Sequence, residues 1–551
     1  MLIAKAKDAA FWARAATDEA YRPLVEDLLA GWEADCANDL PAAKFSEFRL
    51  YYDNGSRKEY EASYFKRRRA MNHSALLAML YPEEEKYLVK LQDCIWAILD
   101  EFTWVLPAHT GPVTQPPIPI DLFCAETGFA LSEIDYILGD RLHPAIRRRI
   151  REECERRIIN TFLNRAFGWE NDHHNWAAVC MGGVTATFLY LAPEKFPLIR
   201  SRLIHTMDCF LDSYSEDGIC YEGFGYWIYG LGFFLCAADL VKDFTEGKIN
   251  LLTDPRVKRT ATYPQRVMVA NGAVASFADG GGNGDISLAM AHYLRGLFPD
   301  VMKIPAIEYT QLKDGCGRWA LHLRSFIWYN PEAEVTDMDS SHEYWSESSQ
   351  VLIKRTGIYG FAAKGGSNAE LHNHNDIGSF LVTVDGKQLL CDPGAGVYSA
   401  QYFNAKLRYE DFCASSRGHS LPIIDGAYQS VGGAHRAKAD YADGRLTLDL
   451  SAGYVVNSAI LPEGSFVREF EIEDARLVMV DRYAPGHTVV ERLIAGAEPV
   501  IEGDVIRIGR LSLKASGFEG SVKITPAPKN GFWCLDFEGV GARFEMEAVI
   551  I

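Results

Sequence analysis

The spacing of hydrophobic residues changes near the middle of the chain. Up to about residue 310, apolar residues recur three or four positions apart, as on one face of an α-helix. The clearest run is Ile146, Ile150, Cys154, Ile158 and Phe162, with arginines between them. No repeat of fixed length is present, so a toroid or solenoid of helices is favoured over a tandem array. Further helices are predicted near 85–103, 120–138, 176–192, 196–214 and 226–243.

Beyond about residue 345, the hydrophobic residues alternate with polar ones, as in half-buried strands. Two apolar runs flank Asp385-Gly386, a pair typical of a two-residue hairpin. Short segments rich in β-branched residues follow at 446–450, 466–473, 476–481, 504–514 and 521–525. The pattern predicts an α+β protein with a helical domain at 1–310, a connector at 311–345 and an antiparallel β-sandwich at 346–551.

Composition and charge narrow the function. A chain of 551 residues exceeds the usual size of one core, so several domains are expected. The formal net charge of -18 excludes nucleic acid as an expected partner, because phosphate binding needs a basic surface. Aromatic residues form 12% of the chain, which modestly favours sugar binding, since aromatic faces stack on sugar rings.

The expected compartment follows from the cysteines and the N-terminal segment. The 12 cysteines are scattered without a CxxC pair, which is typical of reduced thiols. The first residues lack the apolar segment and cleavage site of a signal peptide. No run approaches 18 uninterrupted apolar residues, so no membrane span is expected. These features predict a cytoplasmic protein, unless a leader has been removed.

Three polar clusters stand out against this background. The first, His174-Asn175-Trp176, precedes a helical run. The alternative to a functional role is that these residues only cap the helix. The second spans 217–230 and contains Glu222, Tyr226 and Tyr229 among glycines. Tyrosines in such a segment are packing residues about as often as they are functional ones.

The third cluster contains His372 and His374, followed by Asp392 and His419. The alternative to a functional site is a loop that these side chains merely stabilise by hydrogen bonds. On a strand, His372 and His374 would point to the same side. Two imidazoles and a carboxylate suit a tetrahedral Zn²⁺ site with one open position. A zincin protease is disfavoured, because HExxH is absent.

Taken together and in order, these motifs resemble the heparinase II/III family of polysaccharide lyases. The resemblance covers roughly residues 100–430. It rests on Asn175-Trp176, Glu222-Gly223-x-Gly225-Tyr226-Trp227-x-Tyr229, His372-x-His374-x-Asp376-x-Gly378-Ser379-Phe380, Asp392-Pro393-Gly394 and Arg417-x-His419. Relatives often carry Asn-Asn-Trp or Asn-His where this chain has His174-Asn175-Trp176. The resemblance implies an N-terminal incomplete (α/α) toroid followed by antiparallel β-sheet layers.

The resemblance also implies a reaction, β-elimination at a uronic acid in an acidic poly- or oligosaccharide. Asn175 and His174 would neutralise the uronate carboxylate, so that the proton on C5 can leave. Tyr226 would act as the catalytic base or acid, and Tyr229 is the alternative candidate for this role. His372 would assist the proton transfer.

Further residues are implied to bind substrate or metal. Substrate contacts are expected from Trp176, Glu222, Tyr402, Arg408 and Tyr409. A divalent ion such as Zn²⁺, held by His374, Asp392 and His419, would be structural.

Two other functions remain open from the sequence. A glycoside hydrolase on an (α/α) toroid would use paired carboxylates such as Asp217 and Glu222. A non-catalytic glycan-binding protein with a structural zinc would bind sugar without turnover. The identity of the glycan and the oligomeric state, a homodimer included, are not determined by the sequence.

Overall fold

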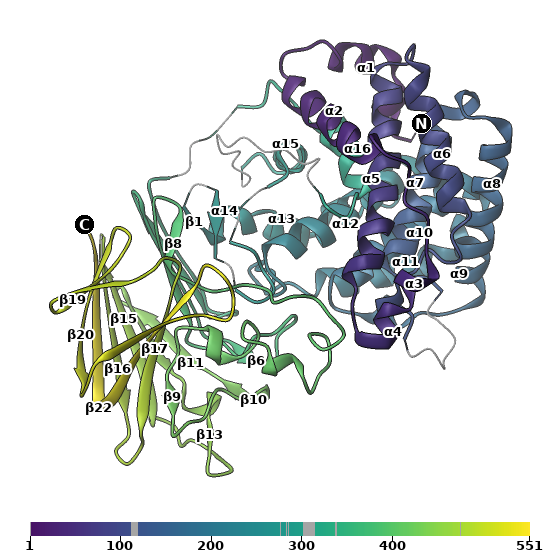
Figure 1. The fold of residues 1–551 in the computed structure, drawn as a ribbon. Helices are drawn as coiled ribbons and strands as arrows, with labels where there is room; N and C mark the ends of the chain where they lie inside the picture. Colours follow the sequence, from purple (N-terminus) through teal and green to yellow (C-terminus); the bar gives the residue numbers. More distant parts are fainter. Residues whose placement is uncertain are drawn as a thin grey trace. The chain divides into compact units, whose positions relative to one another are not determined.

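The computed structural model describes residues 2–111, 119–270, 272–275, 277–282, 284, 286–300, 314–334, 336, 339–473 and 475–551. The chain divides into two compact units. The helical unit comprises Met1–Ser213, Tyr226–Ala261 and Ile286–Thr336. The β unit comprises Tyr214–Gly225, Thr262–Asp285 and Asp337–Ile551. Figure 1 shows helices in the first part of the chain and strands in the last.

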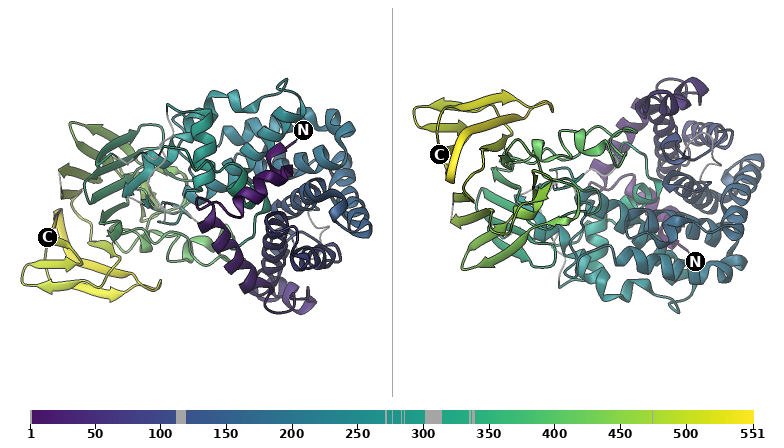
Figure 2. Two further views of the ribbon diagram at one scale, coloured as in Figure 1. Left: turned by 90° about the horizontal axis from the view of Figure 1, so that it is seen from above. Right: turned by 90° about the horizontal axis from the view of Figure 1, so that it is seen from below.

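The helical unit contains helices of 4 to 23 residues, and the longer ones pack side by side (Figure 2). Their bounds are α1 Ala9–Ala15, α2 Arg22–Cys36, α3 Phe45–Phe48, α4 Leu50–Asn54, α5 Lys58–Leu80, α6 Glu85–Leu99, α7 Leu122–Leu138, α8 Pro144–Cys154, α9 Asn160–Asn164, α10 Asn175–Leu191, α11 Phe196–Leu211, α12 Phe224–Phe244, α13 Pro255–Ala261, α15 Leu288–Leu297 and α16 Trp319–Ile327. The predicted helical character of the N-terminal half is confirmed.

The predicted apolar run from Ile146 to Phe162 forms α8, a π-helical turn at Glu155–Ile159 and α9. Residues spaced by exact fours drift around an α-helix, which has 3.6 residues per turn. The wider π turn compensates for this drift. All five apolar residues of the run are consequently buried.

Two helices of this unit are apolar on nearly every side, as expected of core helices. In α10, Gly183 allows close packing on α7, because a Cβ there would lie 2.4 Å from the carbonyl oxygen of Ala125. Among the described residues, α12 is long and apolar enough to cross a membrane by length and composition. Since 78% of its apolar window is buried inside the structure, packing within the protein explains its composition.

The β unit is built on one large antiparallel sheet of sixteen strands among the described residues. The main strand order is β11-β12-β15-β16-β22-β17-β8-β7-β5-β4-β3. These strands are β3 Ser341–Ser346, β4 Val351–Thr356, β5 Tyr359–Lys364, β7 Phe380–Val384, β8 Lys387–Leu390, β11 Lys438–Ala442, β12 Arg445–Asp449, β15 Phe466–Glu473, β16 Arg476–Tyr483, β17 Val489–Ala495 and β22 Trp533–Ile550. The remaining five are β9 Ile423–Ile424, β18 Val500–Glu502, β19 Val505–Ile508, β20 Leu511–Phe518 and β21 Val522–Pro526.

Shorter elements complete the β unit. They are helix α14 Tyr263–Val267 and the pairs β1 Met268–Ala270 with β2 Ala273–Val274, β6 Ser367–Asn368 with β10 Gly432–Arg436, and β13 Val455–Val456 with β14 Ala459–Ile460. The long strand β22 pairs with β16, β17, β20 and β21, and so links the C-terminal strands. The predicted hairpin is present between β7 and β8, where Asp385 and Gly386 both have positive φ, as a type I′ turn requires.

The core of the sheet combines aromatic packing with one buried ionic network. The rings of Phe361 and Phe380 lie 5.3 and 5.1 Å from that of Phe470. The buried guanidinium of Arg468 pairs with Asp481 at 2.6 Å and with Glu491 at 2.8 Å. Because removing one partner would leave a buried charge unpaired, this network holds the strands in register.

The domain boundaries differ from the predicted single division. Two segments of the predicted helical domain, Tyr214–Gly225 and Thr262–Asp285, belong to the β unit. The predicted connector 311–345 contains α16, which belongs to the helical unit, and the start of β3. Hydrophobic periodicity could not reveal this arrangement, because neither segment contains a long periodic element: Thr262–Asp285 holds only α14, β1 and β2.

Candidate active site and metal site

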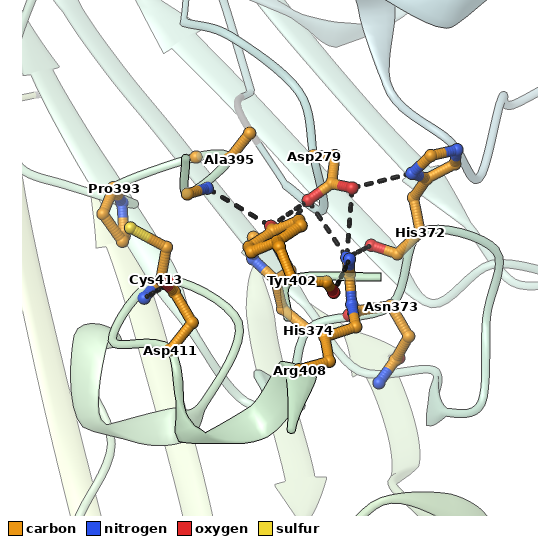
Figure 3. Close-up of polar contacts among 12 residues, drawn as sticks. Asp279, His372, Asn373, His374, Pro393, Ala395, Tyr402, Arg408, Asp411 and Cys413 are labelled. Carbon is orange, nitrogen blue, oxygen red and sulfur yellow. Dashed lines mark hydrogen bonds and ion pairs between the residues drawn. The ribbon is translucent and has the colours of Figure 1, made fainter. Parts of the chain in front are cut away.

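A buried carboxylate, Asp279, lies at the centre of a polar cluster in the β unit (Figure 3). Its Oδ2 atom lies 2.7 Å from Nδ1 of His372, and its Oδ1 atom lies 3.0 Å from Nε2 of His374. One nitrogen of Arg408 donates to both carboxylate oxygens at 3.0 Å. The hydroxyl of Tyr402 donates to Oδ1 as well. Asp279 therefore joins three segments that are distant in the sequence.

These contacts decide the charge of Asp279. Burial alone would raise the pKa of its carboxyl. The hydrogen bonds from His372 and His374, with the charge of Arg408, outweigh burial and hold the pKa far below its usual range. Burial, and then the charge of Asp279, raise the pKa of the Tyr402 phenol. Asp279 is thus a permanent anion, whereas Tyr402 stays protonated and donates to it.

Glycines allow the loop that carries Asp279 to approach its neighbours. A Cβ on Gly394 would lie 2.5 Å from the carbonyl oxygen of Gly280, and one on Gly223 would lie 3.0 Å from its Cα. Both positions have positive φ. The glycines of the Glu222-Gly223 and Asp392-Pro393-Gly394 motifs thus pack these segments against residue 280.

His372 is the residue of this cluster that a ligand can reach. Its side chain is 21% exposed, whereas that of Asp279 is fully buried. Its Nε2 atom lies 3.5 Å from Oε2 of Glu222. The backbone of His372 has a φ of 51°, a left-handed conformation that is uncommon without glycine. Arg408 supports it by donating to the His372 carbonyl at 3.1 Å.

On the other side of His374 lies a second buried group, a candidate metal site. His374, Asp376 and His419 offer ligand atoms within 4.8 Å of one another. Nδ1 of His374 and Oδ2 of Asp376 are buried without a hydrogen-bond partner, whereas Oδ1 of Asp376 pairs with Lys364. Lys364 lies 2.9 Å from Asp376 and 3.2 Å from Glu370, which fixes the loop.

The surroundings of His419 fit a bound cation. Its Nε2 atom donates to the carbonyl of Cys413 at 2.8 Å, so the neutral ring carries its lone pair on Nδ1. That Nδ1 atom lies 3.1 Å from Oδ2 of Asp392, yet neither atom has a hydrogen-bond partner. A proton or a metal ion between them would relieve the repulsion. Burial lowers the pKa of His419, but the charge of Asp392 outweighs burial and raises it overall.

Two imidazoles and two carboxylates form a donor set that Zn²⁺ accepts. Of the three ligands predicted from the sequence, His374 and His419 belong to the group with Asp376, and Asp392 contacts Nδ1 of His419 at 3.1 Å from outside that group. Asp376 was not predicted as a ligand, although it belongs to the quoted motif. His372, His374 and Asp376 lie in the loop between β6 and β7, not on a strand as expected, so strand alternation gave no reliable signal for Asp376.

In the helical unit, the first predicted cluster caps α10. Nδ1 of His174 accepts from the backbone N–H of Trp176 at 3.3 Å, and its Nε2 lies 3.2 Å from Asp172. Asn175 is buried in the first turn. The capping interpretation is therefore correct for His174, and it orients the ring beside Asn175.

Asn175 lies beside the helix that carries Tyr226. A Cβ on Gly230 of α12 would lie 3.3 Å from the Cβ of Asn175. Tyr226 precedes Gly230 by four residues, so it lies one turn away on the same face of α12. Its side chain is half-buried. The helical unit thus places Asn175 against α12, the helix that carries Tyr226.

Tyr229 has a different environment. Its buried hydroxyl donates to Glu126, and the guanidinium of Arg318 lies 4.0 Å from its ring centre. Burial, and then the charge of Glu126, raise its pKa well above the usual value. Burial also raises the pKa of Glu126 to about 7, against the opposing effects of Arg318 and Tyr229.

The predicted substrate contacts fall into two groups. Tyr402, Arg408 and Glu222 are buried, and the first two bind Asp279. Trp176 and Tyr409 are half-buried. The ring of Trp176 lies 4.9 Å from that of His109, and the hydroxyl of Tyr409 accepts from Asn373 at 3.2 Å. A supporting role therefore replaces the predicted substrate contact for Tyr402 and Arg408.

Asp279 itself was missed from the sequence, where Asp279-Gly280 indicates only a turn. The available signal was an acidic residue within Asp279-Gly280-Gly281-Gly282, more glycines than one turn requires. Its partner His372 is 93 residues away, and periodicity carries no information about such a contact.

The carboxylate pair proposed for a hydrolase does not have the expected character. Asp217 accepts hydrogen bonds from the hydroxyls of Ser215, Tyr344 and Ser348. Burial would raise its pKa, but these hydroxyl groups lower it overall. A catalytic acid needs a raised pKa, so Asp217 is a poor general acid.

No family model and no curated protein matches the sequence. Solved structures do match. Heparinase III aligns with a TM-score of 0.62 at 13% identity, covering 90% of this chain and 77% of that one. A mutant heparan sulfate lyase from Pedobacter heparinus aligns with a TM-score of 0.57 at 12% identity, covering 96% and 88%.

Chondroitin AC lyase from Streptomyces coelicolor A3, in complex with chondroitin sulphate, aligns with a TM-score of 0.53 at 11% identity. The alignment covers 98% of this chain and 82% of that one. The chain therefore has the fold of these polysaccharide lyases, as the motifs predicted.

Proposed function

We propose that this chain, which has the fold of heparinase III and chondroitin AC lyase, is itself a polysaccharide lyase. It would cleave a uronic-acid-containing glycan by β-elimination and leave a 4,5-unsaturated uronate. The observation that carries this proposal is the placement of Asn175 beside Gly230 of α12, one turn from Tyr226. The helical unit is accordingly proposed to be an incomplete (α/α) toroid.

Asn175 and His174 would act on the substrate carboxylate. The proton on C5 is barely acidic while that carboxylate is fully charged, so hydrogen bonds to it lower the barrier. His174 is oriented by its contacts with Trp176 and Asp172 and keeps 28% of its side chain exposed. Because both of its ring nitrogens are engaged by these contacts, His174 would position Asn175, which would donate to the carboxylate itself.

Tyr226 would move the proton. Its phenol is half-buried, so it can contact both solvent and substrate. Tyr229 is a weaker candidate, because its hydroxyl is already donated to Glu126 and its pKa is raised by burial. We therefore assign the acid–base role to Tyr226.

His372 would be the catalytic contribution of the β unit. Its Nδ1 atom donates to Asp279, and 21% of its side chain is exposed, so a ligand can contact the ring. Trp176 and Tyr409 remain proposed substrate contacts, and Oε2 of Glu222 lies 3.5 Å from Nε2 of His372.

We propose that His374, Asp376, Asp392 and His419 hold one Zn²⁺ or a similar divalent ion. When bound, the ion would neutralise the buried carboxylates and fix their loops. The orphaned nitrogens of His374 and His419 support this assignment. A structural role is favoured, because all four side chains are buried.

The proposed partner is an acidic poly- or oligosaccharide, in keeping with neighbours that include a chondroitin AC lyase solved with chondroitin sulphate. A cytoplasmic location and action on imported oligosaccharides are proposed from the sequence. A glycan-binding protein without activity is the second candidate, and turnover separates the two. The deciding experiment is incubation with a panel of uronic-acid polymers, following the ultraviolet absorbance of the conjugated alkene.

A further inference from the structure

Two histidines with different neighbours share the carboxylate of Asp279. His372 contacts it through Nδ1 at 2.7 Å, and His374 contacts it through Nε2 at 3.0 Å. The two rings thus present opposite nitrogens to the same group. Their remaining nitrogens face different surroundings, Glu222 for His372 and the candidate metal site for His374.

The chemistry of a carboxylate explains the consequence. An ionised carboxylate only accepts hydrogen bonds, so each ring nitrogen that faces Asp279 must carry a proton. In a neutral imidazole, the other nitrogen then carries the lone pair. For His374 this other nitrogen is Nδ1, which is buried without a hydrogen-bond partner. Metal ligation requires such a lone pair.

Asp279 reaches no ligand itself, since its side chain is fully buried. Arg408 donates to both of its oxygens and also to the carbonyls of His372 and Asn373. The strained His372 backbone is held in place by this bridge. A rigid anion with fixed neighbours is suited to orient other groups.

We propose that Asp279 is a positioning residue that serves two sites at once. It presents Nε2 of His372 to the substrate and Nδ1 of His374 to the metal ion. The substrate half of this inference rests on the proposed lyase function, whereas the metal half does not. Loss of the carboxylate should therefore weaken metal binding and slow turnover together.

Asp279→Asn tests this with little change in volume. Its amide NH₂ group can only donate, so it cannot replace the oxygen that accepts from a histidine or Arg408. Zn²⁺ affinity, measured by competition with a chelating dye, should fall about 10–100-fold, as for other residues that orient metal ligands. The kcat should fall by a similar factor, while KM changes less than about threefold. Asp279→Glu, which restores a carboxylate, should recover part of both.

The matched control is Asp217→Asn, another Asp-to-Asn change in the β unit at a carboxyl held by hydroxyl groups. It should keep the Zn²⁺ affinity of the wild type. Circular dichroism and a cooperative unfolding transition establish that both variants are folded. Wild-type Zn²⁺ affinity and kcat in Asp279→Asn would overturn the proposal, as would a wild-type protein that binds no Zn²⁺. If Zn²⁺ affinity falls as expected but the wild type cleaves no glycan, the lyase function fails while the metal half stands.

Discussion

The hydroxyl of Tyr229 donates a hydrogen bond to the carboxyl group of Glu126 inside the helical unit. Tyr229 is buried, and its phenolate would face the Glu126 carboxylate. This environment disfavours the deprotonated phenol that a catalytic base requires. The contact therefore marks Tyr229 as a packing residue, and the proposed acid–base role stays with Tyr226.

Tyr229→Phe should accordingly keep kcat within about fivefold of the wild type, since it removes no reacting group. Its stability should fall by about 1–3 kcal/mol, because Glu126 loses its buried donor. Urea unfolding and initial rates measure the two effects. A hundredfold loss of kcat in a folded Tyr229→Phe protein would assign the acid–base role to Tyr229 instead.

The stability of the helical unit should depend on two buried histidines. The rings of His73 and His322 are stacked 6.1 Å apart. Asp35 and Arg69 face His73, while Asp314, Arg318 and Arg69 face His322. Burial, and then His322, lower the pKa of His73 to about 4, and burial lowers that of His322 to about 4.

An unfolded histidine has a pKa of about 6.5, so the unfolded state binds more protons between pH 6.5 and 4. Stability is therefore complete above pH 6.5 and is lost as the pH falls, by roughly 3 kcal/mol per histidine. Thermal unfolding at pH 7.5 and 5 should show a smaller drop for the double variant His73→Gln/His322→Gln than for the wild type. His173→Gln, at an exposed histidine of the same unit, should behave as the wild type. Equal drops in all three proteins would refute the assignment.

If the proposed metal site is structural, removal of a ligand should reduce metal content and thermal stability more than kcat. His419→Ala removes one ligand and should abolish stoichiometric Zn²⁺, measured by elemental analysis of protein purified without added metal. The thermal midpoint should fall clearly, because buried carboxylates are left unneutralised. The residual kcat at a temperature where the variant is folded should change less. Full metal content and unchanged thermal stability would show that His419 is not a ligand.

The cysteines provide a test of the proposed cytoplasmic environment. All twelve are free in the structure, and most are buried. Thiol titration of the denatured, unreduced protein should therefore find twelve reactive groups. A substantial shortfall, or secretion of the native gene product, would contradict the proposal.

Much of the fold could be predicted from local sequence. The run from Ile146 to Phe162 and the Asp385-Gly386 turn specify their own elements, because periodicity and turn chemistry act over a few residues. The joining of sixteen described strands into one continuous sheet could not be predicted from local sequence patterns. Strand β22 pairs with four other strands, and the order of pairing depends on contacts between distant segments.

The sequence indicated which types of residue form the candidate site, but not which of them contact one another. His374, Asp392 and His419 were predicted as ligands because few other side chains bind metals, and the structure groups two of them with Asp376. Tyr402 and Arg408 were predicted to bind substrate, yet they support Asp279, and Asp279 went unrecognised. The same charged and polar residue types form buried ion pairs and exposed substrate-binding sites. Only their burial in the folded structure distinguishes the two roles.

The most direct test compares the wild type, Tyr226→Phe and Tyr229→Phe on whichever uronic-acid polymer the wild type cleaves. Products are read by ultraviolet absorbance and mass spectrometry. The wild type should release a 4,5-unsaturated uronate, and Tyr226→Phe should lose about 10²–10⁴-fold in kcat while binding the polymer with similar affinity. Saturated products throughout would mean hydrolysis, and a Tyr226→Phe protein with the wild-type rate would remove Tyr226 from the reaction.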